Sequence, residues 1–137
     1  MSELHDWNTG IAAEFRANGG VVGGPFAGAT LLLLTTTGAR TGATRVNPLV
    51  CLRDGDRYVV FASHAGAPKH PDWYFNLTAH PEVTVEVGTE QFRARAGEIT
   101  GPDRDRIYAA QVESSPQFAE YQQKTARRIP VIGLERI

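Results

Sequence analysis

Apolar and polar residues alternate along most of this chain with the two-residue period of β-strands. Strands are expected at residues 30–37, 44–53, 57–63, 82–87, 91–99 and 129–134. In the third of these, Tyr58 and Val60 point to one face, and Val59 and Phe61 point to the other. Turn residues separate the runs, such as the Asp-Gly pair at 54–55, so the pattern predicts hairpin connections.

Apolar residues at helical spacing predict short helices that are inserted singly between the strands. The helices are expected at about residues 5–18, 71–80, 102–113 and 116–124. Hairpin-linked strands with single helices between them favour the α+β class, in the form of an antiparallel barrel of about six strands. We expect one domain over residues 1–137, in which residues 1–20 form an N-terminal helix whose mobility is left open.

The first helix carries an apolar stripe formed by Trp7, Ile11 and Phe15, and it ends at a glycine pair, as helices commonly do. We expect this stripe to pack on the rest of the protein. Two alternatives are a cover over a ligand and a peripheral contact with a membrane surface. The helix has few Lys and Arg residues for a membrane anchor.

Composition narrows the class of protein. The chain has 137 residues, 42% of them hydrophobic, and a net charge of −1, which favours a folded domain and gives no electrostatic basis for nucleic-acid binding. No apolar run approaches the roughly 18–20 residues of a membrane span, and no signal peptide is expected, so a cytoplasmic protein is favoured, with membrane association as the alternative. Cys51 is the only cysteine, and we expect it in the core, with no disulfide.

The turn at residues 37–45 is the strongest candidate for binding chemistry. Gly38 and Gly42 can adopt positive φ and leave backbone N–H groups open to a ligand, and Arg40 and Arg45 can bind an anion bidentately. Residues 15–53 contain no Asp or Glu, which favours a phosphate-type ligand. The turn leads into a strand, which excludes a Walker A loop and a dinucleotide fingerprint. A hairpin whose arginines merely face water is the alternative.

A second cationic segment precedes the helix that begins near residue 71. His64, Lys69 and His70 lie in an interval without Asp or Glu, and the N–H groups at the helix start would also suit a phosphate or carboxylate. A mobile polar loop is the alternative. Ser63 and His64 are adjacent in a strand pattern and point to opposite faces, so they cannot form a nucleophile–base dyad. No metal site and no carboxylate pair for acid–base chemistry are expected, which leaves cofactor-borne redox chemistry.

Several ordered motifs resemble the deazaflavin-dependent nitroreductase family. They are LTTTGARTG at 34–42, RVNPL at 45–49, ASHAGA at 62–67, PxWYxNL at 71–77, HP at 80–81 and IPV at 129–131. The resemblance covers nearly the whole chain. It implies a split β-barrel related to flavin reductases, coenzyme F420 as the cofactor, and hydride transfer from the reduced deazaflavin to a quinone, nitro or other activated small-molecule acceptor.

The resemblance also implies roles for individual residues. The phosphate ligands and their turn match Gly38, Arg40, Thr41, Gly42 and Arg45, and Asn47 and Pro48 follow beside the cofactor. The loop along the deazaflavin and the helix start match Ser63, His64, Ala65, Gly66, Ala67, Lys69, Pro71, Trp73 and Asn76. The acceptor pocket matches Val50, Phe118 and Tyr121. Ser63 and Tyr121 are the candidate catalytic residues, Ser63 as a hydrogen-bonding partner of the ring or of the developing anion.

Three departures from the family's pattern affect the expected acceptor. His64 stands where the family often has lysine, Val50 where nitroimidazole-reducing members have tyrosine, and Ser115 and Phe118 where further tyrosines occur. A quinone or another flat acceptor is therefore favoured over nitroimidazoles. The alternatives are an FMN-dependent reductase with the same barrel and a non-catalytic deazaflavin carrier. The sequence does not predict the oligomeric state.

Overall fold

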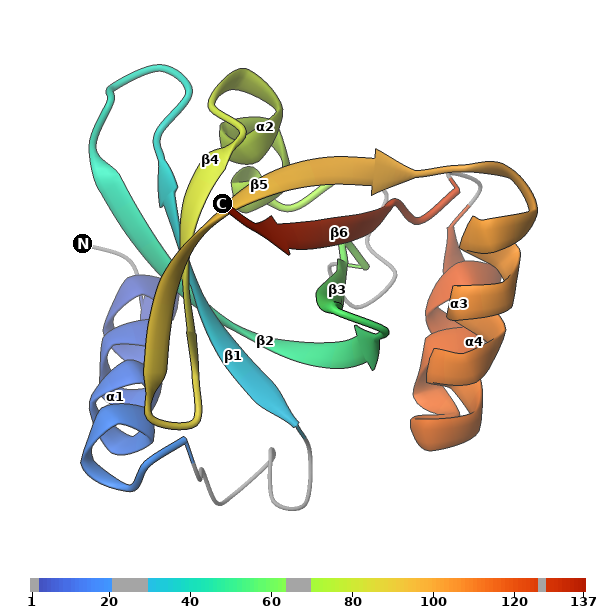
Figure 1. The fold of residues 1–137 in the computed structure, drawn as a ribbon, viewed down its shortest axis with the longest axis horizontal. Helices are drawn as coiled ribbons and strands as arrows, with labels where there is room; N and C mark the ends of the chain where they lie inside the picture. Colours follow the sequence, from blue (N-terminus) through green and yellow to red (C-terminus); the bar gives the residue numbers. More distant parts are fainter. Residues whose placement is uncertain (1–2, 21–29, 64–69, 126–127) are drawn as a thin grey trace.

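The computed structural model describes residues 3–20, 30–63, 70–125 and 128–137, with side chains from Thr9 onward in the first helix (Figure 1). Its helices are α1 (Glu3–Ala17), α2 (Asp72–Ala79), α3 (Gly101–Ser114) and α4 (Gln117–Lys124). Its strands are β1 (Leu31–Thr37), β2 (Thr44–Asp54), β3 (Arg57–Phe61), β4 (Glu82–Val87), β5 (Glu90–Ile99) and β6 (Val131–Arg136). The expected helices and strands are all present, and their ends differ from expectation by at most two residues.

The strands form a closed barrel in the order β1-β2-β3-β6-β5-β4, in which every neighbouring pair is antiparallel. Hairpins join β1 to β2, β2 to β3 and β4 to β5. The other three pairs, β1 with β4, β3 with β6 and β5 with β6, join strands that are distant in the chain, with Leu34 opposite Val85, Val60 opposite Ile132 and Ala96 opposite Leu134. This arrangement confirms the predicted antiparallel barrel of the α+β class.

The last strand begins at Val131, two residues later than expected. Proline has no N–H group with which to continue a strand ladder, so Pro130 marks the boundary. Its carbonyl oxygen still accepts a hydrogen bond from the Ala62 N–H at 3.0 Å, just beyond the end of β3. The chain therefore remains paired across this point even though neither strand formally includes it.

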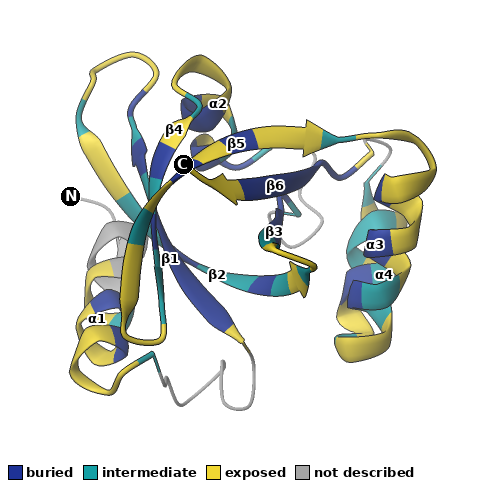
Figure 2. Ribbon diagram, viewed as in Figure 1, coloured by how far each residue is buried: buried dark blue, intermediate teal, exposed yellow. Residues whose placement is uncertain are grey.

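The period of two divides each strand between the barrel interior and its outer face. In β1, Leu32 and Leu34 belong to the interior cluster, whereas Leu31 and Leu33 pack against α1 on the outside. All four are buried, which explains why β1 reads as a continuous apolar run. Exposed residues lie at hairpin tips, on the outer sides of the helices and along much of β5 (Figure 2).

Helix α1 packs along the outer face of β1 and β2 (Figure 1). Ala12 and Phe15 are buried against Leu31 and Leu33, so the described part of the apolar stripe packs on the barrel as expected. Arg16 adds a bidentate ion pair with Glu86 of β4, with N–O distances of 2.9 and 2.8 Å. None of the described helices has the length and hydrophobicity needed to cross a membrane.

The other three helices cover the remainder of the barrel. Trp73 and Leu77 of α2 pack in the interior cluster, so α2 closes one end of the barrel. Helices α3 and α4 pack on the outer face of β3 and β6, where Phe61 lies 5.8 Å from the ring of Tyr108 and 5.6 Å from that of Phe118. Val60 faces the interior and Phe61 faces these helices, which confirms the two expected faces of β3.

Candidate functional site

The turn between β1 and β2 has the glycine-dependent conformation that the sequence suggests, for two different reasons. Gly42 has φ = 71°, a left-handed conformation that side chains disfavour. At Gly38, a Cβ atom would lie 2.9 Å from Thr41 Oγ1 and 3.1 Å from the Ala43 carbonyl oxygen. The Gly38 N–H donates to the Ala43 oxygen at 2.7 Å, and the Gly42 N–H donates to the Gly38 oxygen at 2.9 Å. The turn is therefore compact and internally bonded.

The expectation that this turn leaves its N–H groups open to a ligand needs a correction. Besides the N–H groups of Gly38 and Gly42, that of Ala43 donates to Thr41 Oγ1 at 3.2 Å, and that of Ala39 donates to Asn76 Oδ1 at 3.0 Å. Within the described part of the chain, the N–H groups of Arg40 and Thr41 are the ones in the turn without a protein acceptor. The site for an anion is thus narrowed to the apex of the turn.

The guanidinium groups of Arg40 and Arg45 are exposed beside this apex. Among the described residues neither pairs with a carboxylate, and Arg45 contacts only the carbonyl oxygen of Thr44, at 3.2 Å. The arginines that do form ion pairs are Arg16, Arg57, Arg93, Arg104, Arg106, Arg128 and Arg136. Two unneutralised guanidiniums next to two open N–H groups fit a phosphate group.

Helix α2 lies beside this turn and supplies Asn76, whose side chain is 9% exposed. Its Oδ1 accepts from Ala39, and its Nδ2 donates to Thr36 Oγ1 at 3.2 Å. Trp73 is buried in the barrel interior and Pro71 is buried immediately before the helix, so both anchor α2. Asn76 therefore joins α2 to the turn, and the buried Pro71 and Trp73 hold in place the helix that carries it.

Sequence reasoning missed Thr36, which is 1% exposed and holds Asn76. The sequence does contain a sign of this role, because Thr36 lies an even number of residues from Leu32 and Leu34 in β1 and therefore points to the same interior face. A polar side chain on the buried face of a strand needs a hydrogen-bonding partner. The identity of that partner, 40 positions away, could not be read from the local sequence.

The remaining cofactor candidates lie toward the same end of the barrel. Asn47 and Pro48 follow the turn in β2, and Ser63 lies two residues beyond β3, which runs back toward the turn. Asn47 and Ser63 are half-buried, and Pro48 is buried. The candidates His64, Ala65, Gly66, Ala67 and Lys69 lie outside the described residues.

The three residues expected in the acceptor pocket are not in one cluster. Val50 packs with α1 and Leu33, whereas Phe118 is buried against Phe61. Tyr121 is half-buried at the edge of the cluster formed by Phe61 and the residues of α3 and α4 around it, with its ring 5.2 Å from that of Phe118. Of the two aromatic residues, Tyr121 is thus the one with an accessible surface, and its ring packs against the buried ring of Phe118.

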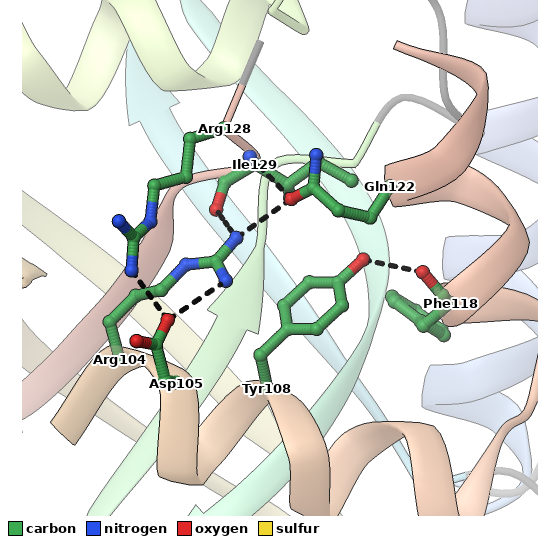
Figure 3. Close-up of polar contacts among 7 residues, drawn as sticks. All are labelled: Arg104, Asp105, Tyr108, Phe118, Gln122, Arg128 and Ile129. Atoms are coloured by element: carbon green, nitrogen blue, oxygen red, sulfur yellow. Dashed lines mark hydrogen bonds and ion pairs between the residues drawn. The ribbon is translucent and has the colours of Figure 1, made fainter. Parts of the chain in front are cut away.

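A buried polar network holds α3, α4 and the segment before β6 together (Figure 3). Arg104 donates to the Ile129 carbonyl oxygen at 2.7 Å and to Gln122 Oε1 at 2.9 Å. Tyr108 donates its hydroxyl proton to the Phe118 carbonyl oxygen at 2.6 Å. Burial, and then the charge of Arg128, lower the pKa of Arg104. Because these bonds reach both ends of α4, they determine where Tyr121 lies.

Two rings pack together at the start of α2, that of His70 before the helix and that of Tyr74 within it. The His70 ring lies 4.5 Å from that of Tyr74, and Tyr74 donates to Glu98 Oε1 at 2.7 Å. Burial and the bond to Glu98 raise the pKa of Tyr74 to about 12, so the phenol stays protonated at neutral pH. The Tyr74 hydroxyl is thus committed to a structural bond rather than to proton transfer.

A cavity of about 650 Å³ opens at the opposite end of the barrel from this turn. Its lining combines aromatic, cationic and anionic side chains, namely Arg53, Asp54, Asp56, Arg57, Tyr58, Glu90, Phe92, Leu134, Glu135 and Arg136. Arg136 is paired with Glu90 and lies over the ring of Phe92, at 4.2 Å. Because Arg57 and Arg136 are paired with carboxylates and further acidic side chains line it, this cavity suits a phosphate less well than the turn does.

Comparison with known proteins places the chain among deazaflavin enzymes. A model of the family described as F420H(2)-dependent quinone reductase matches residues 8–136. An F420H(2)-dependent quinone reductase of Mycobacterium tuberculosis is 39% identical over 140 residues, which cover 99% of this chain and 90% of that protein.

Solved structures agree with this match. A structure of an F420-H2 dependent reductase (FDR-A) has a TM-score of 0.71 at 42% identity and covers 77% of this chain and 94% of its own. A structure described as a domain-swapped dimer has a TM-score of 0.74 at 37% identity, and the match covers 95% of this chain and 98% of that chain. A heme storage protein from Vibrio cholerae shares the fold alone. Its TM-score is 0.62 at 17% identity, and the match covers 95% of this chain and 90% of that chain.

Proposed function

The chain belongs to the F420H(2)-dependent quinone reductase family, and from this premise we propose how it acts. It is an F420-dependent reductase that uses the turn at residues 38–45 to hold the cofactor and the surface of α4 to hold the acceptor. The reduced deazaflavin, when bound, supplies the hydride that a quinone-type acceptor receives. The family match favours a quinone over a nitro compound, and F420 over FMN.

The observation that carries the site assignment is the pair of unneutralised guanidiniums at the turn. Arg40 and Arg45 stand beside the open N–H groups of Arg40 and Thr41, and all of these groups are hydrogen-bond donors. Such an array fits the phosphate of the cofactor, because it offers charge and directed donors without an internal carboxylate to compete. We infer that the phosphate binds here.

The proposal assigns the reacting part of the site to Ser63 and Tyr121. Ser63 lies beyond β3 toward the same end of the barrel as the turn, where its hydroxyl can donate to the cofactor ring or to charge that develops on the acceptor. Tyr121 is half-buried on α4 and offers an aromatic face against which a flat quinone can stack. No nucleophile is required, because the contribution of the chain is proximity and orientation.

Fluorescence titration with F420, and with FMN in parallel, tests the cofactor assignment. We expect Arg40→Ala and Arg45→Ala each to raise the Kd for F420 about ten- to hundredfold, the consequence of losing a charge-assisted hydrogen bond. Arg53→Ala is the matched control, since Arg53 is an exposed arginine without a carboxylate partner on the same strand, roughly 26 Å from Arg45 at 3.3 Å per residue. Native affinity in both turn variants would contradict the site.

Turnover separates the reductase from its alternatives. Reduced F420 is mixed with the protein and a soluble naphthoquinone, and the return of the oxidised cofactor is followed by absorbance. We expect oxidation that depends on both protein and quinone, faster than with a nitroaromatic acceptor. Tight binding without oxidation by any acceptor would identify a deazaflavin carrier, and preference for FMN would identify a flavin reductase.

Self-association is part of the same proposal. The structural relative that covers 98% of its own chain is described as a domain-swapped dimer. We infer that this chain also dimerises, and light scattering on the purified protein would then give twice the 14.9 kDa of one chain. A mass of a single chain at micromolar concentration would contradict this inference.

A further inference from the structure

The side chain of Asn76 joins two parts of the chain that are distant in sequence. It lies on α2, and it bonds to the backbone of the β1–β2 turn at Ala39 and to the side chain of Thr36 inside β1, at 3.0 and 3.2 Å. Both ends of its amide group are therefore used by the protein. Thr36 is 1% exposed and Asn76 is 9% exposed, so the bond between them is buried, whereas the bond to the exposed Ala39 is partly buried.

The other hydrogen bonds of the turn arise within the turn itself. They join Gly38 to Ala43, Gly42 to Gly38, and Ala43 to the side chain of Thr41. Among the hydrogen bonds of the described residues, the one from Ala39 to Asn76 is thus the bond that joins the turn to another element. Ala39 immediately precedes Arg40, whose N–H and guanidinium groups belong to the proposed phosphate site.

Asn76 is held rigidly by its own helix. Its neighbours Trp73 and Leu77 are buried in the barrel interior at 5% and 4% exposure, so α2 cannot shift without opening the core. An asparagine suits this position because it offers one acceptor and one donor in fixed geometry, whereas leucine offers neither and aspartate lacks the donor. Rigid support of this kind reduces the conformational entropy that the turn would otherwise lose on binding.

We propose that Asn76 is a positioning residue, which orients the phosphate-binding turn through the N–H group of Ala39 rather than by contact with the cofactor. The proposal rests on the function proposed above, in that the turn must be the cofactor's phosphate site. It assigns to Thr36 the role of holding the Asn76 amide in the orientation that presents Oδ1 to Ala39.

The first test needs no cofactor. Hydrogen exchange at the Ala39 amide is measured by NMR in the unliganded full-length protein. We expect Asn76→Ala to speed this exchange at least about tenfold, because the amide loses its acceptor. Thr78→Ala is the matched control on the same helix, since Thr78 is exposed and bonds only to Tyr74 of its own helix. Unchanged exchange at Ala39 in Asn76→Ala would overturn the proposal, whether or not the protein binds F420.

The second test uses a residue that cannot touch the cofactor. Thr36→Val keeps the shape of the side chain and removes the acceptor of the Asn76 amide. Because Thr36 is buried, its replacement reaches the cofactor only through Asn76. We expect Kd for F420 to rise about three- to tenfold in Asn76→Ala and by a smaller factor in Thr36→Val, with kcat at saturating cofactor within about twofold of the wild type. An effect of Asn76→Ala on Kd with none of Thr36→Val would indicate a direct contact with the cofactor and overturn the proposal.

A double-mutant cycle with Arg40→Ala separates the two roles for a protein that folds normally. If Asn76 acts through the turn, the effects of Asn76→Ala and Arg40→Ala on Kd overlap, and the double variant is weaker than either single variant by less than the product of their effects. Fully multiplicative effects would mean that Asn76 acts elsewhere. If Asn76→Ala does not fold, Thr36→Val replaces it in both the hydrogen-exchange test and the double-mutant cycle. Failure of the wild type to bind F420 would refute the proposed function and leave the exchange test to decide the role of Asn76 in the turn.

Discussion

Replacing Arg104 by methionine tests whether the buried network of Figure 3 holds α4 in position. Arg104 is 8% exposed, and the substitution removes its bonds to the Ile129 carbonyl oxygen and to Gln122 Oε1, at 2.7 and 2.9 Å. Methionine retains an apolar chain that can pack on the ring of Tyr108, over which the guanidinium lies at 4.5 Å. The change therefore removes charge and hydrogen bonding with little loss of volume.

The magnitude follows from opposing contributions. Each of the two bonds to a charged donor contributes about 1.5–3 kcal/mol. The Arg104 Nε atom is buried without a partner among the described groups, and removing it returns about 1–3 kcal/mol. We expect a net loss of about 2–4 kcal/mol in the free energy of unfolding. For a chain of this size that corresponds to a fall of roughly 6–15 °C in Tm.

Urea unfolding and thermal melting measure the loss, and steady-state kinetics shows its functional consequence. Because α4 carries Tyr121, we expect KM for the quinone to rise while Kd for F420 changes by less than about twofold. Arg106→Met is the control, since Arg106 lies two positions along α3 and is 57% exposed, so its ion pairs contribute little. Buried ions are sometimes replaced by apolar residues without loss. A variant as stable as the wild type would therefore refute the reasoning.

Three further predictions concern groups with shifted pKa values. Burial raises the pKa of the Cys51 thiol to about 12, so a disulfide reagent at pH 8 should react with it in the unfolded protein but not in the folded one. The pKa of Tyr74 is raised from 10.0 to about 12, so the stability it contributes is present below pH 10 and is lost as pH rises through 12. Ultraviolet titration should show one tyrosine that ionises at higher pH than the others, and Glu98→Gln should lower the pKa of that tyrosine. Hydrogen bonding, first from Arg106, lowers the pKa of Asp54 below 3.8, so its stabilisation is present above pH 3.8 and is lost as pH falls through the lowered value. Acid unfolding of Asp54→Asn should lack this part of the pH dependence, and an unchanged acid limb would contradict it.

Local patterns in the sequence determined the elements and their faces. The alternation in β3 placed Val60 in the barrel and Phe61 against α3 and α4, because side chains of an extended strand must point alternately to its two sides. The apolar stripe on α1 placed Phe15 against the barrel in the same way. The motifs around the β1–β2 turn led to the deazaflavin family, and the family match supports that conclusion.

Tertiary structure decided which groups remain available for binding. The sequence shows two glycines and two arginines in the turn, but it does not show that Asn76, 37 positions away, occupies the N–H group of Ala39. Nor does it show that Glu86 neutralises Arg16 across 70 positions, while Arg40 and Arg45 stay without a carboxylate among the described residues. Backbone period and residue type act over a few residues and can be read locally. Hydrogen bonds and ion pairs depend on which side chains barrel closure brings within about 3 Å of each other, and that is a property of the whole fold.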